Sequence, residues 1–396
     1  MTDQLVRPTA DLHVSGRFDE VMGRIADLDP VLRAEAEANE AGGRLTPRVA
    51  EALHDSGVYL MSMPRELGGL EFTPRQVIAA VEALSRADAS TGWVAMTLQM
   101  AAGTTAAYLG RGPWEEITAE HGDRTLAAGQ GTRPGRAVTV DGGFLLSGSW
   151  QFASGLHHAT HVHTAALVEE TGEARVFTLP KERATIVDDW DVMGLRATGS
   201  VDYHCEEVFV PTEHTYVATT TEPLLGGAVF RLGLANFASL QHVGWGLGVG
   251  RRLLDEMQAL AARKTGTPGA TVDNPEFHAA YGAAEATLRA ARAWNMEVWA
   301  DVEATLESGA TLSVDQETLV RQALAHATSA AEEVGRTVYR WAGTAALRAG
   351  DLNRAFRDLH GGTQHVTSGP AVRQGCGRRL AGLAPEASWV FLSLVD

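Results

Sequence analysis

The segment Ser313–Trp341, SVDQETLVRQALAHATSAAEEVGRTVYRW, has the clearest secondary-structure signal in the chain. Ser313 and Gln316 match a capping box, in which each side chain accepts a hydrogen bond from the other residue's backbone N–H at the start of a helix. Seven residues then recur at spacings of three and four: Leu319, Ala323, Ala327, Ala330, Val334, Val338 and Trp341. This spacing predicts a long helix with one buried face, which needs other helices to pack against it.

Two more helices are predicted before this segment. The first contains four closely spaced glycines, Gly244, Gly246, Gly248 and Gly250. Each glycine costs a helix about 1 kcal/mol relative to alanine, so we expect another helix to approach this one closely. Phe277, Tyr281 and Leu288 mark the second helix. We predict four long helices, arranged as a bundle, in a C-terminal domain over residues 229–396.

Helices are also predicted over residues 1–124. One apolar face is formed by Phe18, Val21, Ile25, Leu28 and Leu32. Thr46-Pro47 begins a short helix that Gly57 ends, and Thr73–Gln76 is a second capping box. Residues 93–109 are rich in Ala, Thr and Met, which is typical of a closely packed helix.

The pattern changes near residue 125 to short apolar runs separated by turn residues. The predicted strands form two hairpins and two further segments, Ala137–Val140 with Phe144–Leu146, Val162–Glu169 with Ala174–Leu179, Ala184–Val187 and Val201–Val210. These runs predict a β sandwich or barrel over residues 125–228. The fold class is therefore α+β, with a β domain between two helical ones.

Composition excludes several kinds of partner. The chain of 396 residues has 33 basic and 49 acidic residues, a net charge of −16, which disfavours nucleic acids and anionic membranes. Its two cysteines, Cys205 and Cys376, lie far apart and provide neither a disulfide framework nor a zinc ribbon. The first 16 residues have no apolar core, so we expect no signal peptide and a cytoplasmic protein.

Familiar nucleotide and hydrolase motifs are absent from the sequence. No G-x-G-x-x-G follows a predicted strand, and there is no P-loop, H-E-x-x-H or G-x-S-x-G. Four histidines lie close together, His157, His158, His161 and His163. In a strand His158 would face away from the last two, and no Asp or Cys is at ligand spacing. We predict no metal site and expect these histidines to line a cleft or sheet surface.

Two segments have a structural and a functional interpretation. Trp150 and Phe152 could close the core of the β domain, or form an apolar wall for a flat ligand with the Ser154 hydroxyl at its edge. Arg263 and Lys264 close a predicted helix. They could compensate the helix dipole, or Arg263 could bind a phosphate.

The segment Asn353–Pro370, NRAFRDLHGGTQHVTSGP, is where we expect the chemistry. His360 and His365 flank Gly361-Gly362, and these glycines are expected to bend the chain and leave His365 partly open. Residue types alone favour a structural role for both histidines, because no nucleophile accompanies them.

Several stretches together resemble the acyl-CoA dehydrogenase superfamily. The matching segments are Met63–Gly69, Ser147–Gly155, Trp190–Ser200, Arg357-Asp358 and Gly362–Gln364, in the family's order. The third resembles the family's G-x-R-x-[ST]-x-[ST] strand segment. The resemblance implies an N-terminal α domain, a middle β domain, a C-terminal four-helix bundle and a homotetramer.

One departure from the family pattern bears on the activity. Dehydrogenases of the medium-chain type have a catalytic Glu before the G-T element, where this chain has Gly361 or Gly362 and no carboxylate between Asp358 and Pro370. Arg357-Asp358-x-His360 followed by His365 is similar to the flavin-dependent monooxygenase branch. That branch takes reduced FMN or FAD from a separate reductase.

The resemblance implies a role for each site residue. His365 would lie beside flavin C4a and act as donor or base, and Ser154 would contact N5, stabilising a C4a-(hydro)peroxide formed with O₂. Trp150 and Phe152 would exclude water, Arg263 would meet the flavin phosphate across a subunit interface, and Gln130 and Thr132 would line the flavin edge. The implied substrate is an aromatic or heteroatom-bearing small molecule. The alternatives are an acyl-CoA dehydrogenase or oxidase with its base on another helix, and a catalytically silent ligand-binding protein.

Overall fold

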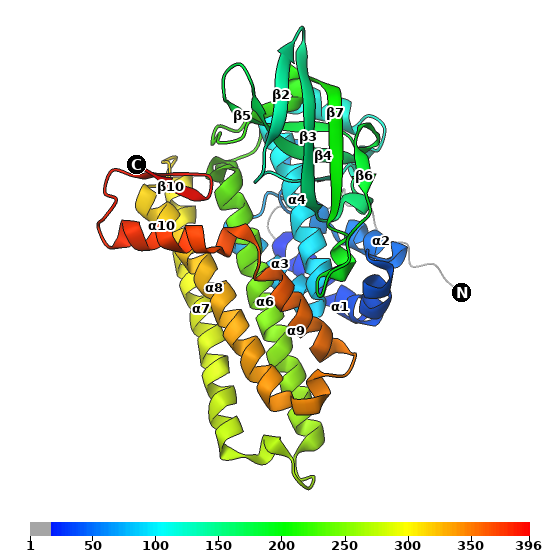
Figure 1. The fold of residues 1–396 in the computed structure, drawn as a ribbon, viewed down its shortest axis with the longest axis vertical. Coiled ribbons are helices and arrows are strands. Elements are labelled where there is room, and N and C mark those ends of the chain that lie inside the picture. Colours follow the sequence, from blue (N-terminus) through cyan, green and yellow to red (C-terminus); the bar gives the residue numbers. More distant parts are fainter. Residues whose placement is uncertain (1–16) are drawn as a thin grey trace. The chain divides into compact units, whose positions relative to one another are not determined.

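The computed structural model describes residues 17–396, so the expectation about a signal peptide in residues 1–16 lies outside it. The described chain divides into two compact units. The first contains residues 17–76, 94–190 and 197–234, and the second contains residues 77–93, 191–196 and 235–396. The order of helices, strands and helices along the chain follows the prediction (Figure 1). No helix within residues 17–396 combines the length and apolar character needed to cross a bilayer.

The first unit begins with helices whose ends follow the predicted capping residues. Helix α1 spans Arg17–Gly42, and the short α2 spans Pro47–Ser56. The Thr46 side chain accepts a hydrogen bond from the Val49 N–H, and Gly57 ends α2 in the left-handed conformation at φ 82°. Helix α5, Arg111–Thr118, leads into the sheet. The predicted apolar face is confirmed for α1, where Val21, Ile25 and Leu32 are buried.

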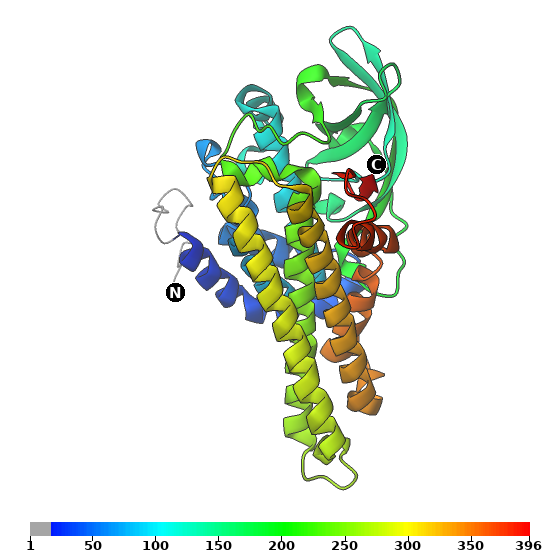
Figure 2. The same ribbon diagram turned by 90° about the vertical axis from the view of Figure 1, so that its left-hand side faces the viewer.

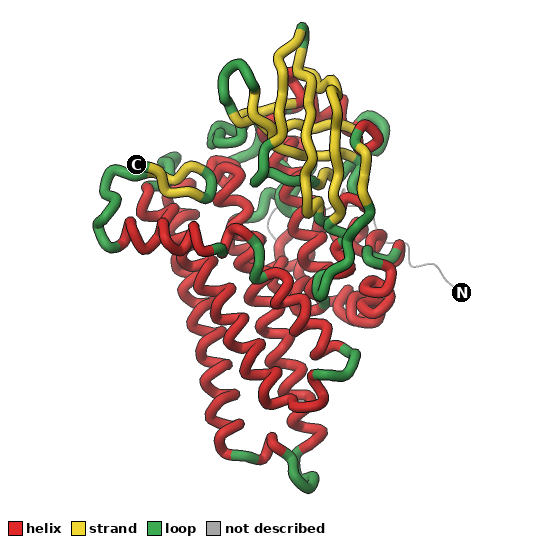
Figure 3. The backbone as a smooth tube through the Cα atoms, viewed as in Figure 1, coloured by secondary structure: helices red, strands yellow, loops and turns green. Residues whose placement is uncertain are grey.

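One eight-stranded sheet lies in the first unit (Figure 3, yellow). Its strands are β1 Ala127–Ala128, β2 Gly135–Val140, β3 Gly143–Ala153, β4 His161–Val168, β5 Ala174–Pro180, β6 Thr185–Val187, β7 Val201–Pro211 and β8 Thr215–Val217. The strand order is β6-β7-β3-β2-β4-β5-β8, with β1 paired to β4. Both predicted hairpins, β2–β3 and β4–β5, are confirmed as antiparallel pairs.

The second unit is built on three long helices, α6 Gly233–Lys264, α7 Pro275–Glu307 and α8 Val314–Ala342, which lie side by side (Figure 2). The capping box of Ser313 and Gln316 is present at the start of α8. The fourth helix, α9 Asp351–Gly362, has only 12 residues, so the expectation of four long helices is wrong for this one. Helix α10, Pro370–Leu380, and a hairpin of β9 Ser388–Val390 and β10 Ser393–Val395 follow it.

Helix α3, Pro74–Ala87, approaches the glycines of α6 closely, as their spacing predicted. A Cβ at Gly244 would lie 2.7 Å from the Ile78 carbonyl oxygen. A Cβ at Gly248 would overlap the Glu82 carbonyl oxygen and lie 2.8 Å from the Ser85 Cβ. Two glycines one turn apart therefore let two backbones come closer than any side chain would allow.

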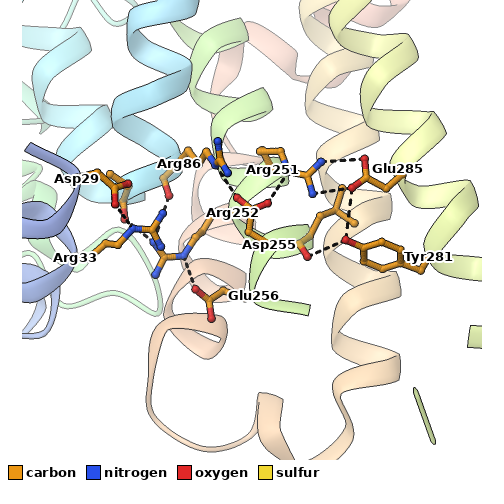
Figure 4. Close-up of polar contacts among 11 residues, drawn as sticks. Asp29, Arg33, Arg86, Arg251, Arg252, Asp255, Glu256, Tyr281 and Glu285 are labelled. Atoms are coloured by element: carbon orange, nitrogen blue, oxygen red, sulfur yellow. Dashed lines mark hydrogen bonds and ion pairs between the residues drawn. The ribbon is translucent and has the colours of Figure 1, made fainter. Parts of the chain in front are cut away.

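Ion pairs connect α3, α6 and α7 (Figure 4). The Asp255 carboxylate accepts from Arg86 Nε at 2.6 Å and from Arg251 Nε at 2.9 Å. Arg251 also donates both terminal nitrogens to the Glu285 carboxylate, at 2.8 and 2.9 Å. Hydrogen bonds from Arg251 hold the pKa of Glu285 below its usual range. This bidentate geometry is the strong form of an arginine–carboxylate pair and fixes the rotation of α6 against α7.

The close approach of α3 and α6 makes opposite predictions for two neighbouring glycines. Gly248→Ala should lower the free energy of unfolding by about 1–3 kcal/mol, because the added methyl group overlaps backbone atoms. Gly246→Ala should be neutral or stabilise by up to about 1 kcal/mol, because the nearest atom is 4.0 Å away and alanine favours helix. Urea denaturation of both variants measures this difference, and equal effects would show that α3 does not restrict Gly248.

Candidate active site

The two histidines of the segment Asn353–Pro370 lie in helix α9 and in the turn after it. His360 lies in the last turn of α9, with its Nδ1 2.8 Å from the Phe356 carbonyl oxygen and its ring 4.2 Å from the Phe356 ring. It is thus bound to its own helix. The helix ends at Gly362, as the glycine pair predicted, but Gly361 and Gly362 themselves are helical and neither has a positive φ. The chain leaves the helix only after them, at Thr363.

His365 follows in the turn, where it caps the short 3-10 helix Val366–Ser368. Its Nδ1 accepts a hydrogen bond from the Thr367 N–H at 3.4 Å and lies 2.8 Å from the Thr367 Oγ1. Because a backbone N–H can only donate, Nδ1 is the unprotonated nitrogen and Nε2 carries the proton. Burial lowers the pKa of His365 to about 4, so the ring is neutral at pH 7. Of the two roles considered, this geometry favours the hydrogen-bond donor.

Three aromatic side chains surround His365, and all three come from other parts of the second unit. The His242 ring stacks on the His365 ring at 4.0 Å between centroids and 29° between planes. The Trp93 indole meets the His365 ring edge-on at 5.5 Å and the His242 ring at 5.0 Å. Trp245 in turn meets Trp93 edge-on at 4.9 Å. Helices α4, Ala89–Leu109, and α6 thereby enclose His365 in a cluster of rings.

Trp245 explains Gly362, one of the two glycines at which a dehydrogenase carboxylate would be expected. A Cβ at Gly362 would overlap the six-membered ring of the Trp245 indole. That indole is held in place by a 2.9 Å hydrogen bond from its Nε1 to the Ala89 carbonyl oxygen, and it is 2% exposed. A Cβ at Gly361 would meet only ordinary contacts, the nearest at 3.4 Å. The indole therefore excludes any side chain from position 362.

The Arg357-Asp358 pair holds a loop of the same unit. The Asp358 carboxylate accepts a 2.6 Å hydrogen bond from the Leu195 N–H, and an Arg357 terminal nitrogen donates to the Met193 carbonyl oxygen at 2.8 Å. Gly194 lies directly against the Arg357 carbonyl group, where a Cβ would overlap it. The Arg357-Asp358 motif thus connects α9 with residues 191–196, and its role is structural.

Ser154 belongs to the first unit and lies in a chain of three hydroxyl groups. Its Oγ is 2.7 Å from the Ser200 Oγ, which is 2.6 Å from the Thr198 Oγ1. Gly155, at φ 77°, donates its N–H to the Thr198 carbonyl oxygen. Thr198 ends the 3-10 turn Arg196–Thr198, and β7 begins at Val201, where the strand Val201–Val210 was predicted.

Trp150 and Phe152 do not act as a pair, either in the core or as a wall, because they lie in different environments. Trp150 is 1% exposed, stacks on Tyr203 at 5.3 Å and donates its Nε1 to the Ala165 carbonyl oxygen. Phe152 is 56% exposed and has φ 65°, next to a register shift in the β3–β7 ladder. The core interpretation therefore holds for Trp150. Phe152 is the aromatic side chain that faces outward, with Trp190 edge-on at 6.0 Å.

Gln130 and Thr132 lie in the loop between β1 and β2. The Gln130 Oε1 accepts from both the N–H and the Oγ1 of Thr132 at 2.7 Å, and its Nε2 donates to the Gln151 carbonyl oxygen. The Gln130 side chain thus connects the loop to the end of β3. The Gln130 amide is hydrogen-bonded within the protein. Gln130 therefore stabilises this edge of the sheet and does not present its side chain to a ligand.

Arg263 lies in the last turn of α6, as the helix-dipole interpretation requires. It is exposed, and it comes 21 residues after His242 on the same helix. At 1.5 Å per residue this separates the two by about 30 Å. Within one chain, Arg263 therefore cannot contact a cofactor that also lies against the ring cluster of His242 and His365.

The histidines at 157–163 are mostly buried rather than on a sheet surface. His163 Nε2 is 2.8 Å from the Tyr216 Oη, and His161 Nδ1 is 2.9 Å from the Thr160 Oγ1. His158 lies in a 3-10 turn before β4, so it is not part of the strand. No group of three His, Cys, Asp or Glu residues within 17–396 could hold a metal ion. Both cysteines are free and buried.

Sequence reasoning missed His242, Trp93 and Trp245, which contact or enclose His365. Their only local signal was the run of glycines around Trp245, which was interpreted as a helix contact. It also missed the hydroxyl partners of Ser154. Their signal was present, because Thr198 and Ser200 are the two hydroxyl positions of the G-x-R-x-[ST]-x-[ST] segment.

Comparison with known proteins identifies the class of this fold. Residues 28–111 match the family model for the acyl-CoA dehydrogenase N-terminal domain, and residues 240–369 match that for the acyl-CoA dehydrogenase C-terminal domain. A crystal structure of a 3-HSA hydroxylase from Rhodococcus sp. RHA1 superposes with a TM-score of 0.85 over 92% of this chain and 97% of that chain, at 24% identity.

Relatives in sequence indicate the branch of this superfamily to which the chain belongs. Indole-3-acetate monooxygenase from Pseudomonas putida is 33% identical over 388 residues, 96% of each chain. The oxygenase subunit HsaA, a flavin-dependent monooxygenase of Mycobacterium tuberculosis, is 32% identical over 194 residues, 48% of this chain and 49% of that protein. The chain belongs to the acyl-CoA dehydrogenase superfamily and, within it, to the flavin-dependent monooxygenases. It acts with reduced flavin, which implies a reductase, on a small-molecule substrate.

The residues of the first unit fit a flavin. The loop of Gln130 and Thr132, the end of β3 and the turn before β7 are joined by hydrogen bonds, so they form one continuous edge. This edge contains the buried, hydrogen-bonded hydroxyl groups of Ser154 and Ser200 and the exposed ring of Phe152. Hydrogen-bonding groups beside an exposed aromatic ring suit a flat heterocycle that has polar atoms along its rim.

The buried histidines make the stability of the protein sensitive to acid. Burial lowers the pKa of His163 from 6.5 to about 4, so below pH 6.5 the unfolded chain binds a proton that the folded chain does not. This one group should remove about 2 kcal/mol of stability between pH 7 and pH 5. In urea denaturation at both pH values, His163→Gln should lose correspondingly less stability than the wild type. The exposed His204→Gln should match the wild type, and an unchanged His163→Gln profile would contradict the assignment.

Proposed function

We propose that this oxygenase inserts one oxygen atom from O₂ into an aromatic or heteroatom-bearing small molecule, using FMN or FAD reduced by a separate enzyme. The observation that supports this most is the neutral His365, a hydrogen-bond donor among aromatic rings, in a segment that has no carboxylate between Asp358 and Pro370. Indole-3-acetate, the compound named for the relative from Pseudomonas putida, belongs to the proposed substrate class.

We propose complementary roles for the two predicted catalytic residues. The reduced flavin, when bound, supplies the electrons that activate O₂. His365 donates its Nε2–H at the reacting edge of the flavin, and its bond to Thr367 keeps the proton on that nitrogen. Ser154 offers its hydroxyl at N5, oriented by the hydrogen bond to Ser200. Phe152 keeps water away from the flavin, and Trp150 acts indirectly by anchoring β3 in the sheet.

The alternative of a dehydrogenase with a relocated base receives no support from the ring cluster. A base on another helix would have to be a carboxylate near His365, but the side chains whose rings contact His365 are His242 and Trp93. Neither of these side chains is a carboxylate. Anaerobic addition of an acyl-CoA to the protein with oxidised flavin should therefore leave the flavin spectrum unbleached.

Turnover under ¹⁸O₂ tests the proposed reaction. With a flavin reductase, NADH and indole-3-acetate or a related aromatic compound, the product should gain a single ¹⁸O atom by mass spectrometry. His365→Ala should lower product formation about 100-fold or more and release H₂O₂ instead, because a positioned donor is lost. Circular dichroism and the flavin dissociation constant should stay near the wild-type values. Unlabelled product, or full coupling in His365→Ala, would contradict the proposal.

His360→Phe is the matched control for this experiment. Its ring already packs on Phe356, and its Nδ1 is hydrogen-bonded to the Phe356 carbonyl oxygen. The variant should therefore keep most of the hydroxylation activity.

We also propose that the protein is a cytoplasmic homotetramer in which Arg263 of one subunit binds the flavin phosphate of another. Support comes from the exposed position of Arg263, about 30 Å along α6 from His242. Arg263→Ala should weaken flavin binding about tenfold in fluorescence titrations, whereas the adjacent Lys264→Ala should have a smaller effect. Sedimentation velocity should show a tetramer for both variants, and a monomeric wild type would rule this assignment out.

A further inference from the structure

His242 has no part in the function proposed above, although its ring stacks on the proposed catalytic histidine. It lies on α6 one turn before Trp245, so both face the same side of the helix. The stack with His365 is tight, with 4.0 Å between centroids. Trp93 meets the edges of both imidazoles, which fixes their orientation relative to each other.

In this ring cluster one hydrogen-bond acceptor, a ring nitrogen of His242, has no partner among the described residues. His365 Nδ1 accepts from Thr367, so its remaining nitrogen, Nε2, is a donor. Trp245 donates to the Ala89 carbonyl oxygen, and an indole has no acceptor. A neutral imidazole has one donor and one acceptor nitrogen. Within residues 17–396 neither nitrogen of His242 makes a hydrogen bond, so His242 supplies the acceptor of the ring cluster.

His242 can be reached by a ligand and is neutral near pH 7. The residue is half-buried rather than enclosed, although its faces are covered by His365 and Trp93. Burial, and then the neighbouring His365, lower its pKa well below the usual value. Its acceptor nitrogen is therefore not lost to protonation, and its accessible ring edge is the part that a ligand can bind.

We propose that His242 binds the substrate directly, by accepting a hydrogen bond from a hydroxyl or ring N–H group on an aromatic ring. This rests on the proposed function and defines its substrate class more closely, as phenols and N–H heteroaromatic compounds. Such a hydrogen bond orients the ring beside His365. It also raises the electron density of the ring, which favours attack by an electrophilic oxygen. Analogues methylated on that oxygen or nitrogen should bind poorly.

Binding of two matched probes, indole and 1-methylindole, tests this assignment without turnover. Isothermal titration calorimetry on the protein loaded with oxidised flavin should show that indole binds roughly three- to tenfold more tightly. His242→Phe keeps the stacked ring but has no acceptor, and it should bind both probes equally. His326→Phe is the matched control, because His326 also packs edge-on against a tryptophan, Trp294, but is exposed on α8. The His326→Phe variant should keep the preference for indole over 1-methylindole.

Nitrogen-15 spectra of histidine-labelled protein provide a second measurement on the same samples. The ring nitrogen signals that disappear in His242→Phe belong to His242, and indole should shift one of them while 1-methylindole should not. A wild type that binds neither probe, or binds both equally, overturns the proposal. So does a His242→Phe variant that is folded and keeps the preference. Failure of ¹⁸O incorporation with these results intact would instead overturn the proposed reaction.

Discussion

The position of the Trp245 indole determines the arrangement of the second unit around its ring cluster. Its N–H is bound to the first carbonyl group of α4, its ring covers Gly362 of α9, and its edge meets Trp93. Three elements distant in sequence are thus held by one side chain. Gly362, the last residue of α9, lies under this ring, and His365 in the following turn stacks on His242. The same contact leaves no room for a side chain at position 362.

A neutral pair of imidazoles in an aromatic environment suits oxygen chemistry better than proton abstraction from carbon. Two stacked histidines cannot both be charged at low cost, and burial alone already lowers the pKa of His365 to about 4. At neutral pH the pair therefore has one fixed hydrogen-bond donor, on His365, and one acceptor, on His242. These groups can hold and orient polar atoms without taking a proton permanently, and the surrounding indoles limit the access of water.

Local patterns in the sequence predicted the helices and hairpins well, because caps, periodicity and turn residues act over a few residues. The capping box at Ser313 and the close approach at Gly248 are examples. The site was less predictable. His242 and Trp93 reach His365 only through tertiary packing, which no local period encodes. Phe152 left the predicted face because β3 contains an irregularity with φ 65°, a conformation that the residue type disfavours. The family resemblance identified the reaction class, but not these neighbours.

The two buried cysteines have a consequence for an enzyme that handles O₂. Cys205 lies in β7 and Cys376 in α10, and burial raises the pKa of each thiol to about 11. Oxidants such as H₂O₂ react with thiolates, not thiols. At neutral pH fewer than about one in a thousand of these groups is ionised, and each is covered by its own domain core. Neither described cysteine is therefore a ready target for peroxide.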